Sequence, residues 1–252
     1  MESCKHINFL LDETNSIELI VCHHSMLSYP IHNHISVYVI CLITDGIVNV
    51  TINNNLQSYK VGEVFVIPPY CPHSIHATQE YSMISLCIRE DAIENVKFDI
   101  IKDSIVNMLD LIPAFDDQHI DLESMFQALS KLLSTRNPVD VSGTDIVNSV
   151  RILLESSPEK KISIDEMAQL AFISKYHFIR SFKQEVGLTP HQFQLQNRIR
   201  KAQRLLHKAD RVTDVALSAG FCDQSHFIRQ FERIVRLTPS KYVSACNTFW
   251  GK

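Results

Sequence analysis

The feature that most constrains the fold is a repeat in the C-terminal half of the chain. The segment HFIRSF (177–182) recurs as HFIRQF (226–231), and the tripeptide LTP (188–190) recurs at 237–239. Both pairs are offset by 49 residues and together share eight identities, which chance explains poorly. A repeat with one fixed offset predicts two copies of the same supersecondary unit.

Each copy has the residue pattern of a helix-turn-helix. In the first copy, residues 163–187, Ser163 and Glu166 form a capping box that predicts the start of a helix. Ser174 is the predicted N-cap of the second helix, and Gly187 is the residue expected to end it. The residues predicted to be buried are Met167, Leu170 and Ala171 in the first helix, and Phe178, Phe182 and Val186 in the second.

The second copy, residues 212–236, repeats this arrangement, with Gly220 at the turn and Asp223 as the N-cap. Its predicted inward residues are Val212, Val215, Ala216 and Ala219 in the first helix, and Phe227, Phe231 and Val235 in the second. Between the copies, Pro190 is favourable at the first position of a linker helix over residues 190–208. Such a helix spans about 27 Å, so two rigidly joined units could enter successive major grooves of DNA.

The outer faces of the two copies suit DNA recognition. Arg180 and Arg229 can each pair bidentately with guanine, and Gln224 can do so with adenine. Ile179 and Ile228 can contact thymine methyl groups, and the remaining cations can contact phosphates. The predicted DNA-binding residues are Tyr176, Ile179, Arg180, Lys183, Arg200, Gln224, Ser225, Ile228 and Arg229.

The charge distribution indicates two domains. The whole chain has a net charge of −4, but residues 1–140 hold 7 Lys and Arg against 18 Asp and Glu, a net charge of −11. Residues 141–252 hold 17 against 10, a net charge of +7. This basic half favours a nucleic-acid partner. The alternative is a helical bundle with ordinary surface charge.

The acidic half begins with strand signals. Short runs rich in Val and Ile, separated by turn residues such as Asp45-Gly46, predict a small barrel or sandwich. These runs are 17–21, 37–43, 47–52, 64–68 and 82–88. Helical spacing then predicts two amphipathic helices, 101–112 and 122–133, the second with Asp121 as N-cap. They either cover a core or form a dimer face.

The cysteine content and the lack of long apolar runs indicate the cellular compartment of the protein. The seven cysteines are scattered and contain no Cys-x-x-Cys pair, which is typical of reduced thiols. No apolar run approaches the roughly 20 residues of a membrane span, and the N-terminus has no signal-peptide pattern. We therefore expect a cytoplasmic protein without a membrane partner.

Residues from about 145 to 246 resemble the DNA-binding domain of the AraC/XylS family of bacterial transcription regulators. The resemblance rests on an Ala-rich helix, Gly220-Phe221, the polar cap at Asp223, the Phe-x-Arg-x-Phe motif at 227–231 and Thr238-Pro239. It implies DNA contacts at Tyr176, Ile179 and Arg180 in the first unit, and at Gln224, Ser225, Ile228 and Arg229 in the second.

One departure from this pattern is Arg236, which stands where the first copy has Gly187. If the position is left-handed, Arg costs about 1 kcal/mol relative to Gly. Alternatively, the second unit ends differently, or Arg236 gains a phosphate contact.

The strand-rich half resembles the cupin barrel that is often fused to such DNA-binding domains. The matching text is His32-Asn33-His34, Gly46, the segment GEVFVIP (62–68) and His73. Two histidines at alternate positions of a strand point to the same face, and His73 could close a metal triad.

This resemblance has gaps. Metal cupins also use a Glu after His-x-His, where this chain has Tyr38 and Val39, and Tyr70 replaces a Gly. The predicted effector or metal site comprises His32, His34, His73, His76 and Cys71. Such ligands suit Zn, Ni, Co or Cu. The alternative is that the histidines are hydrogen-bonded around an organic effector, or around nothing.

The combined prediction is an α+β chain of two domains. Residues 1–95 form a cupin-like sensing β-barrel, 96–133 form helices for dimerisation or interdomain contact, 134–144 are a linker, and 145–252 form an all-α DNA-binding domain with two helix-turn-helix units. We expect a sequence-specific transcription activator, not an enzyme, that responds to a small effector or a metal ion. Its expected partners are double-stranded promoter DNA, RNA polymerase and a second copy of itself.

Two other functions compete with this prediction. The first is a cupin metalloenzyme, a dioxygenase or isomerase with an accessory helical domain, which leaves the repeat unexplained. The second is an adaptor whose barrel senses nothing.

Overall fold

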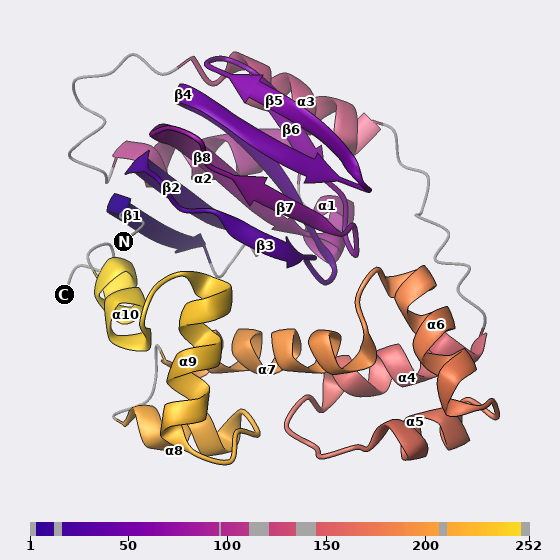
Figure 1. Cartoon of the computed structure of the whole chain (residues 1–252). Coiled ribbons are helices and arrows are strands. Elements are labelled where there is room, and N and C mark those ends of the chain that lie inside the picture. The colour runs from indigo at the N-terminus through magenta and orange to yellow at the C-terminus, as the bar shows by residue number, and fades with distance from the viewer. Residues whose placement is uncertain are drawn as a thin grey trace. The chain divides into compact units, whose positions relative to one another are not determined.

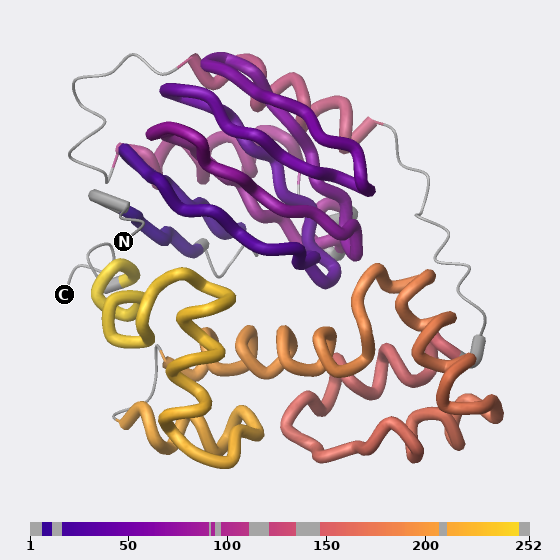
Figure 2. The backbone as a smooth tube through the Cα atoms, in the orientation of Figure 1, coloured from indigo at the N-terminus to yellow at the C-terminus, as the bar shows by residue number. Residues whose placement is uncertain are grey.

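The computed structural model has two compact units, drawn in Figure 1 and traced as a tube in Figure 2. One unit holds residues 1–138 together with 244–252, and the other holds residues 139–243. The structure describes residues 4–12, 17–95, 97–110, 121–134, 145–206 and 211–247. The linker predicted at 134–144 lies outside these residues, except for Ser134. Within the described residues, no helix combines the length and apolarity that a membrane span requires.

The N-terminal unit is built on a curled antiparallel sheet that forms a half-barrel. Its described strands are β1 (Cys4–Asp12), β2 (Ile17–Ser25), β3 (Tyr29–His32), β4 (Val37–Ile52), β5 (Asn55–Lys60), β6 (Val64–Ile67), β7 (His73–His76) and β8 (Tyr81–Arg89). Their order is β1-β2-β8-β4-β7-β3, and β5 and β6 also pair with β4. The first half of β4 pairs with β6 and β8, and its second half pairs with β5 and β7. The sheet therefore curls around this one long strand.

The continuity of β4 corrects one expectation. The sequence predicts two strands, 37–43 and 47–52, with a turn at Asp45-Gly46. The observed strand instead runs through this point with a register shift between Ile43 and Asp45. Gly46 has φ of +72°, and a Cβ there would lie 2.2 Å from the carbonyl oxygen of Glu80. A glycine that permits a turn also permits a bulge, so the Asp-Gly signal is ambiguous.

The strands that the sequence pattern does not predict are β1, β3, β5 and β7. β3 and β7 have four residues each, and both contain polar side chains. β5, with the sequence NLQSYK, is an exposed edge strand with no apolar alternation. Such strands are held by their neighbours, and periodicity does not find them.

Helices pack on one face of the sheet. They are α1 (Glu90–Asn95), α2 (Phe98–Asp110) and α3 (Glu123–Ser134), and Asp121 accepts a hydrogen bond from the backbone N–H of Glu123 at 2.9 Å. Their buried residues share one cluster with alternate strand residues such as Leu19, Ile40 and Leu86. The apolar stripes of α2 and α3 therefore cover the core, and a dimer role for these helices stays a prediction.

The other face of the sheet forms a second apolar cluster. Val39, Cys41 and Ile43 alternate with the residues that face the helices and pack with residues of β6 and β8. Burial raises the pKa of the Cys41 thiol to about 12 and also raises the pKa of Cys71. Both side chains are therefore protonated thiols at neutral pH, which opposes a role as redox nucleophiles.

The two repeated copies form the helical part of the chain. The helices are α4 (Asp145–Ser156), α5 (Ile164–Leu170), α6 (Lys175–Val186), α7 (Pro190–Leu206), α8 (Val212–Ser218), α9 (Gln224–Val235) and α10 (Pro239–Asn247). α5 with α6, and α8 with α9, are the two helix-turn-helix units. The linker helix α7 contacts α6 in the first unit and both helices of the second. The predicted fold class, a strand-rich domain followed by this helical domain, is confirmed.

The predicted helix caps are also confirmed. The Ser163 hydroxyl accepts from the backbone N–H of Glu166, and the Glu166 carboxylate accepts from the backbone N–H of Ser163 at 2.7 Å. Ser174 and Asp223 cap α6 and α9 in the same way, each accepting from the N–H three residues ahead. Local side chain-to-backbone bonds of this kind depend only on near neighbours, which is why sequence reveals them.

The buried stripes agree with the prediction except that Val212 and Val235 are only partly buried and Leu170 is exposed. Phe178, Phe182, Phe227 and Phe231 are fully buried, but Leu170 is 53% exposed. Met167, Ala168 and Ala171 set the buried side of the short helix α5. Leu170 lies about 100° around the helix from the centre of that stripe, so it faces solvent.

The turns of the two units differ by one residue. α5 and α8 end at Ala171 and Ala219, which share backbone angles of φ −84° and ψ −2°, an offset of 48 residues. The next residue is left-handed in both units, Phe172 with φ +53° and Gly220 with φ +89°. The second turn therefore contains one extra residue, Cys222, before its N-cap.

The end of α9 settles the question raised by Arg236. This residue is left-handed, with φ +65°, and its N–H donates to the carbonyl of Glu232, as that of Gly187 donates to Lys183. We expect Arg236→Gly to raise the free energy of unfolding by about 1 kcal/mol. Urea unfolding of the full chain, followed by the circular dichroism signal of the helices, measures this change in the free energy of unfolding. The reciprocal Gly187→Arg should be destabilising by a similar amount; a less stable Arg236→Gly protein would contradict the argument.

Candidate nucleic-acid interface and histidine cluster

The first candidate reading surface is the outer face of α6. Because Phe178 and Phe182 bury the inner face, helical periodicity turns Tyr176, Arg180 and Lys183 outward. All three side chains are exposed, Tyr176 to 77%, and Ile179 is partly exposed. The structure therefore gathers the predicted contacts of the first unit on one helix face.

The second candidate surface is the start and outer face of α9. Gln224, Ser225 and Arg229 are exposed, and Ile228 is partly exposed. The sequence prediction missed Thr213 on α8, whose hydroxyl donates to Oε1 of Gln224 at 2.8 Å. This bond orients the Gln224 amide so that its N–H donors can face an acceptor on a base. A contact across the turn leaves no local sequence signal.

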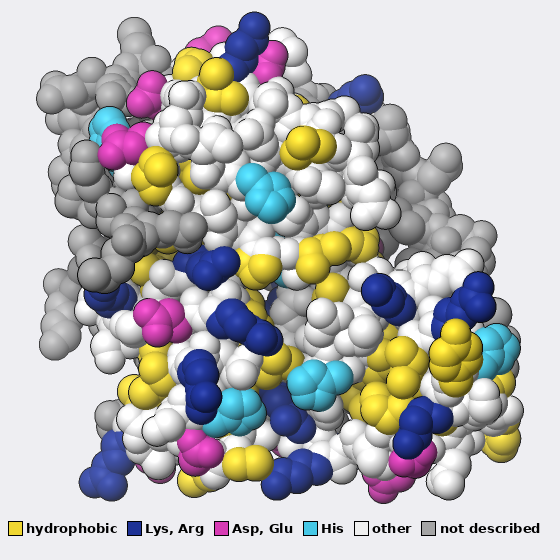
Figure 3. Space-filling model, viewed as in Figure 1, with side chains coloured by type: hydrophobic (Ala, Val, Ile, Leu, Met, Phe, Trp, Pro, Cys, Tyr) yellow, Lys and Arg dark blue, Asp and Glu magenta, His cyan; other side chains and the backbone are white. Residues whose placement is uncertain are grey.

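Arg200 differs from the other predicted cationic contacts. It lies on the linker helix α7, it is partly buried, and its Nη1 atom is enclosed by the protein. Arg180, Lys183 and Arg229 are instead open to solvent. Figure 3 shows many Lys and Arg side chains over the helical unit, as expected from the net charge of +7 in residues 141–252.

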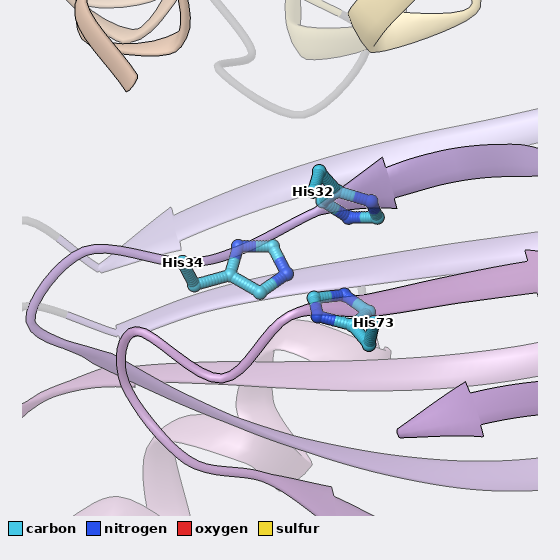
Figure 4. Close-up of side chains that lie close together, drawn as sticks. All are labelled: His32, His34 and His73. Carbon is cyan, nitrogen blue, oxygen red and sulfur yellow. The ribbon is translucent and has the colours of Figure 1, made fainter. Parts of the chain in front are cut away.

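Three histidines of the N-terminal unit form a compact cluster, drawn in Figure 4. His32 ends β3 and is paired in the sheet with His73, the first residue of β7, whereas His34 lies in the loop after β3. One ring nitrogen from each residue lies within 4.8 Å of the other two. His73 is buried and the other two are partly exposed, so the cluster is accessible from one side.

Backbone carbonyls orient two of these rings. Nδ1 of His32 lies 2.8 Å from the carbonyl oxygen of Pro30, and Nδ1 of His73 lies 3.0 Å from that of Cys71. A carbonyl can only accept, so in a neutral ring Nδ1 carries the proton and Nε2 keeps its lone pair. Metal-binding histidines are usually held by this kind of bond. The donor set therefore fits a divalent transition metal.

Further hydrogen bonds fix the loop that carries His34. The backbone N–H of Tyr70 donates to the carbonyl of His34 at 2.7 Å, and the Tyr70 hydroxyl lies 2.8 Å from that of Ser36. Tyr70 has φ of +61°. The residue that stands in place of the cupin Gly thus adopts a glycine-like backbone, while its side chain ties the two loops together.

The other two predicted site residues have different partners. The Cys71 thiol donates to Oδ1 of Asn53 at 3.3 Å, and Nε2 of the exposed His76 lies 2.9 Å from the Ser74 hydroxyl. The structure therefore brings together three of the five predicted residues. The metal-ligand group found among the described side chains contains no carboxylate.

Two family models match the chain. One, described as an AraC-like ligand binding domain, matches residues 15–145, and the other, described as a helix-turn-helix domain, matches residues 167–245. The first model alone spans just over half of the 252 residues.

Individual relatives give the same picture. The uncharacterized HTH-type transcriptional regulator YbfI of Bacillus subtilis (strain 168) is 28% identical over 223 residues, which cover 79% of this chain and 81% of that protein. The crystal structure of ToxT from Vibrio cholerae O395 has a TM-score of 0.60 at 16% identity, covering 91% of this chain and 98% of ToxT. Unsaturated fatty acid bound ToxT from Vibrio cholerae strain SCE256 has a TM-score of 0.57 at 13% identity, covering 98% of each chain.

The ToxT likeness shows a shared fold, and none of these comparisons supports the metalloenzyme alternative. The matched models and the observed units occur in the same order, a curled sheet first and paired helix-turn-helix units second. The chain therefore belongs to the AraC family of transcription regulators, with a ligand-binding domain followed by a helix-turn-helix DNA-binding domain.

Proposed function

We propose that this regulator binds an asymmetric promoter site by placing α6 and α9 in successive major grooves on one face of the duplex. The observation that carries the proposal is the exposure of both second helices on units joined by one linker helix. The 17 residues of α7 span about 26 Å, which is compatible with grooves about 34 Å apart once the widths of the units are added.

Within this arrangement, the long cationic side chains divide by role. Arg180 and Arg229 are the guanine-reading residues, since their exposed guanidinium groups offer two parallel donors. Lys183 and Arg200 contact phosphates, Arg200 after its side chain turns outward. The other base contacts come from Tyr176, Ile179, Gln224, Ser225 and Ile228.

The effector is a transition metal ion held by His32, His34 and His73. Support comes from the distance of 4.8 Å that bounds the three nitrogens and from the backbone carbonyls that orient the rings of His32 and His73. Three imidazoles suit Zn, Ni, Co or Cu rather than the oxygen-preferring Mg and Ca. When bound, the ion would connect β3, β7 and the loop after β3.

An anionic lipid, such as the fatty acid in the ToxT structure, is a competing effector. A buried carboxylate requires a cationic partner. Among the strand side chains that the structure describes, the Lys and Arg residues are Lys60 and Arg89, and both are exposed. A carboxylate inside the half-barrel would therefore need protonated histidines as its partners, whereas a metal ion binds the neutral rings.

The proposed outcome of DNA binding is activation through contact with RNA polymerase, with a second copy of the chain as a further partner. Family membership supports a role in transcription, and activation is the sense of regulation that we propose. Footprinting on the genomic sites that the protein occupies should show two protected segments about one helical turn apart on the same face. In vitro transcription from such a site should rise when protein is added. A single protected groove would contradict the two-groove proposal, and lower transcription would contradict activation.

A further inference from the structure

The loop between α4 and α5 leads into the first helix-turn-helix unit and bonds to the linker helix α7. Nε of Arg198 donates to the carbonyl of Pro158 at 2.8 Å, and its Nη2 donates to that of Lys160 at 3.2 Å. Nε2 of Gln194 donates to the same Lys160 carbonyl at 2.8 Å. These bonds hold the backbone carbonyls of Pro158 and Lys160 against one face of α7.

An ion pair adds to these bonds. Nζ of Lys201 lies 2.8 Å from Oε2 of Glu159, and this hydrogen bond lowers the pKa of the Glu159 carboxyl. Gln194, Arg198 and Lys201 are spaced four and three residues apart, so they line one stripe of α7. Residues 158–160 are therefore bound to α7 by hydrogen bonds and an ion pair that extend over nearly two turns of the linker helix.

The turn of the second unit touches the same loop. A Cβ on Gly220 would lie 2.6 Å from Cα of Glu159, 2.7 Å from its carbonyl oxygen and 3.1 Å from Nε of Arg198. Any side chain at this position would therefore push the second unit away from the loop. The loop that leads into the first helix-turn-helix unit therefore contacts the turn of the second unit directly, as well as through α7.

The first unit supplies an internal comparison. Its residue at the equivalent left-handed position is Phe172, which is 91% exposed. The left-handed turn is thus compatible with a large side chain in this protein. The close approach of Glu159, more than the backbone conformation, accounts for glycine at position 220.

We propose that residues 158–160 form a latch that fixes the orientation of α9 relative to α6, with Arg198 and Gly220 as positioning residues. The inference rests on the proposed two-groove binding. The linker helix alone fixes the distance between the two helix-turn-helix units. The latch adds a second connection, which resists rotation of one helix-turn-helix unit relative to the other about the axis of α7. The latch therefore sets how strictly the protein reads the spacing between its two subsites.

The test uses the full-length protein and its footprinted site, with one or two base pairs inserted or deleted between the subsites. The wild type should lose on the order of 10-fold or more in affinity when the spacing changes, since each base pair rotates one groove relative to the other. Arg198→Met, which keeps the aliphatic stem but removes the donors, should bind the native spacing on the order of 10-fold more weakly. The difference in affinity between the native and the altered spacings should be much smaller for Arg198→Met than for the wild type.

Three comparisons make the result decisive. Arg204→Met removes an exposed arginine from the same helix and should keep the wild-type spacing preference. Arg198→Lys should restore part of that preference, and Gly220→Ala should reduce it as Arg198→Met does. A purely structural role for Arg198 would lower affinity for all spacings equally, and that result would overturn the latch. A wild type indifferent to spacing would instead overturn the two-groove binding itself.

Discussion

Replacing both Arg180 and Arg229 with alanine should weaken binding to the promoter site by about 2–6 kcal/mol, which is roughly 30-fold to 25,000-fold in affinity. A bidentate arginine–guanine pair contributes about 1–3 kcal/mol of discrimination. The two arginines lie on different helix-turn-helix units, so their effects should add. Titration of labelled duplex at fixed salt measures the loss, because affinities for DNA depend strongly on ionic strength.

Two further substitutions separate base reading from general charge. Lys183→Ala should weaken binding to specific and non-specific duplexes about equally. It should also reduce the slope of log affinity against log salt concentration by about one, because one phosphate contact is lost. Lys60→Ala removes an exposed cation from β5 in the other domain and should change nothing. If the double arginine variant binds the promoter as the wild type does, the assignment of α6 and α9 as reading helices is wrong.

His73→Ala should reduce affinity for Co²⁺ or Zn²⁺ by more than about 100-fold. Loss of a residue that merely orients a ligand costs about 10–100-fold, and loss of a buried ligand should exceed that. Titration of the full-length protein with Co²⁺, followed by its visible absorption, measures binding directly. A metal at 100 times its dissociation constant should also stabilise the wild type by about 2.7 kcal/mol, an effect that the variant should lack.

The matched controls are variants of the two predicted ligands, His76 and Cys71, that do not belong to the three-histidine cluster. His76→Ala and Cys71→Ser should bind metal as the wild type does, because Ser74 and Asn53 are their partners. An equal loss from His76→Ala would show a ligand set different from the proposed one. A wild type that binds none of the four metals, yet is stabilised by a fatty acid, would replace the metal with a lipid effector.

Sequence reasoning succeeded where structure depends on near neighbours. The capping box at Ser163, the cap at Asp223 and the four-residue spacing of the phenylalanines are local features, and each is visible in the sequence. The unit that they define recurs, so each copy supports the interpretation of the other. The resemblance to the AraC/XylS family rests on these same residues.

What the sequence missed depends on tertiary contacts. β4 continues through Gly46 because β8 lies beside it, and the loop of His34 is fixed by a bond to Tyr70, 36 residues away. The contact between Glu159 and Gly220 joins residues 61 positions apart. Neither periodicity nor a motif can show that two backbones meet, although an unexplained glycine is a hint.

The linker helix has a consequence for protein engineering. Residues 193–197 of α7 are all buried and three of them are polar, and helices of both helix-turn-helix units contact α7. Separating one helix-turn-helix unit from the other would expose the surface of residues 193–197 and remove the partners of its polar groups. Chimeric regulators with new DNA specificities should therefore exchange the whole segment from α4 through α9, since the duplicated halves are no longer interchangeable modules.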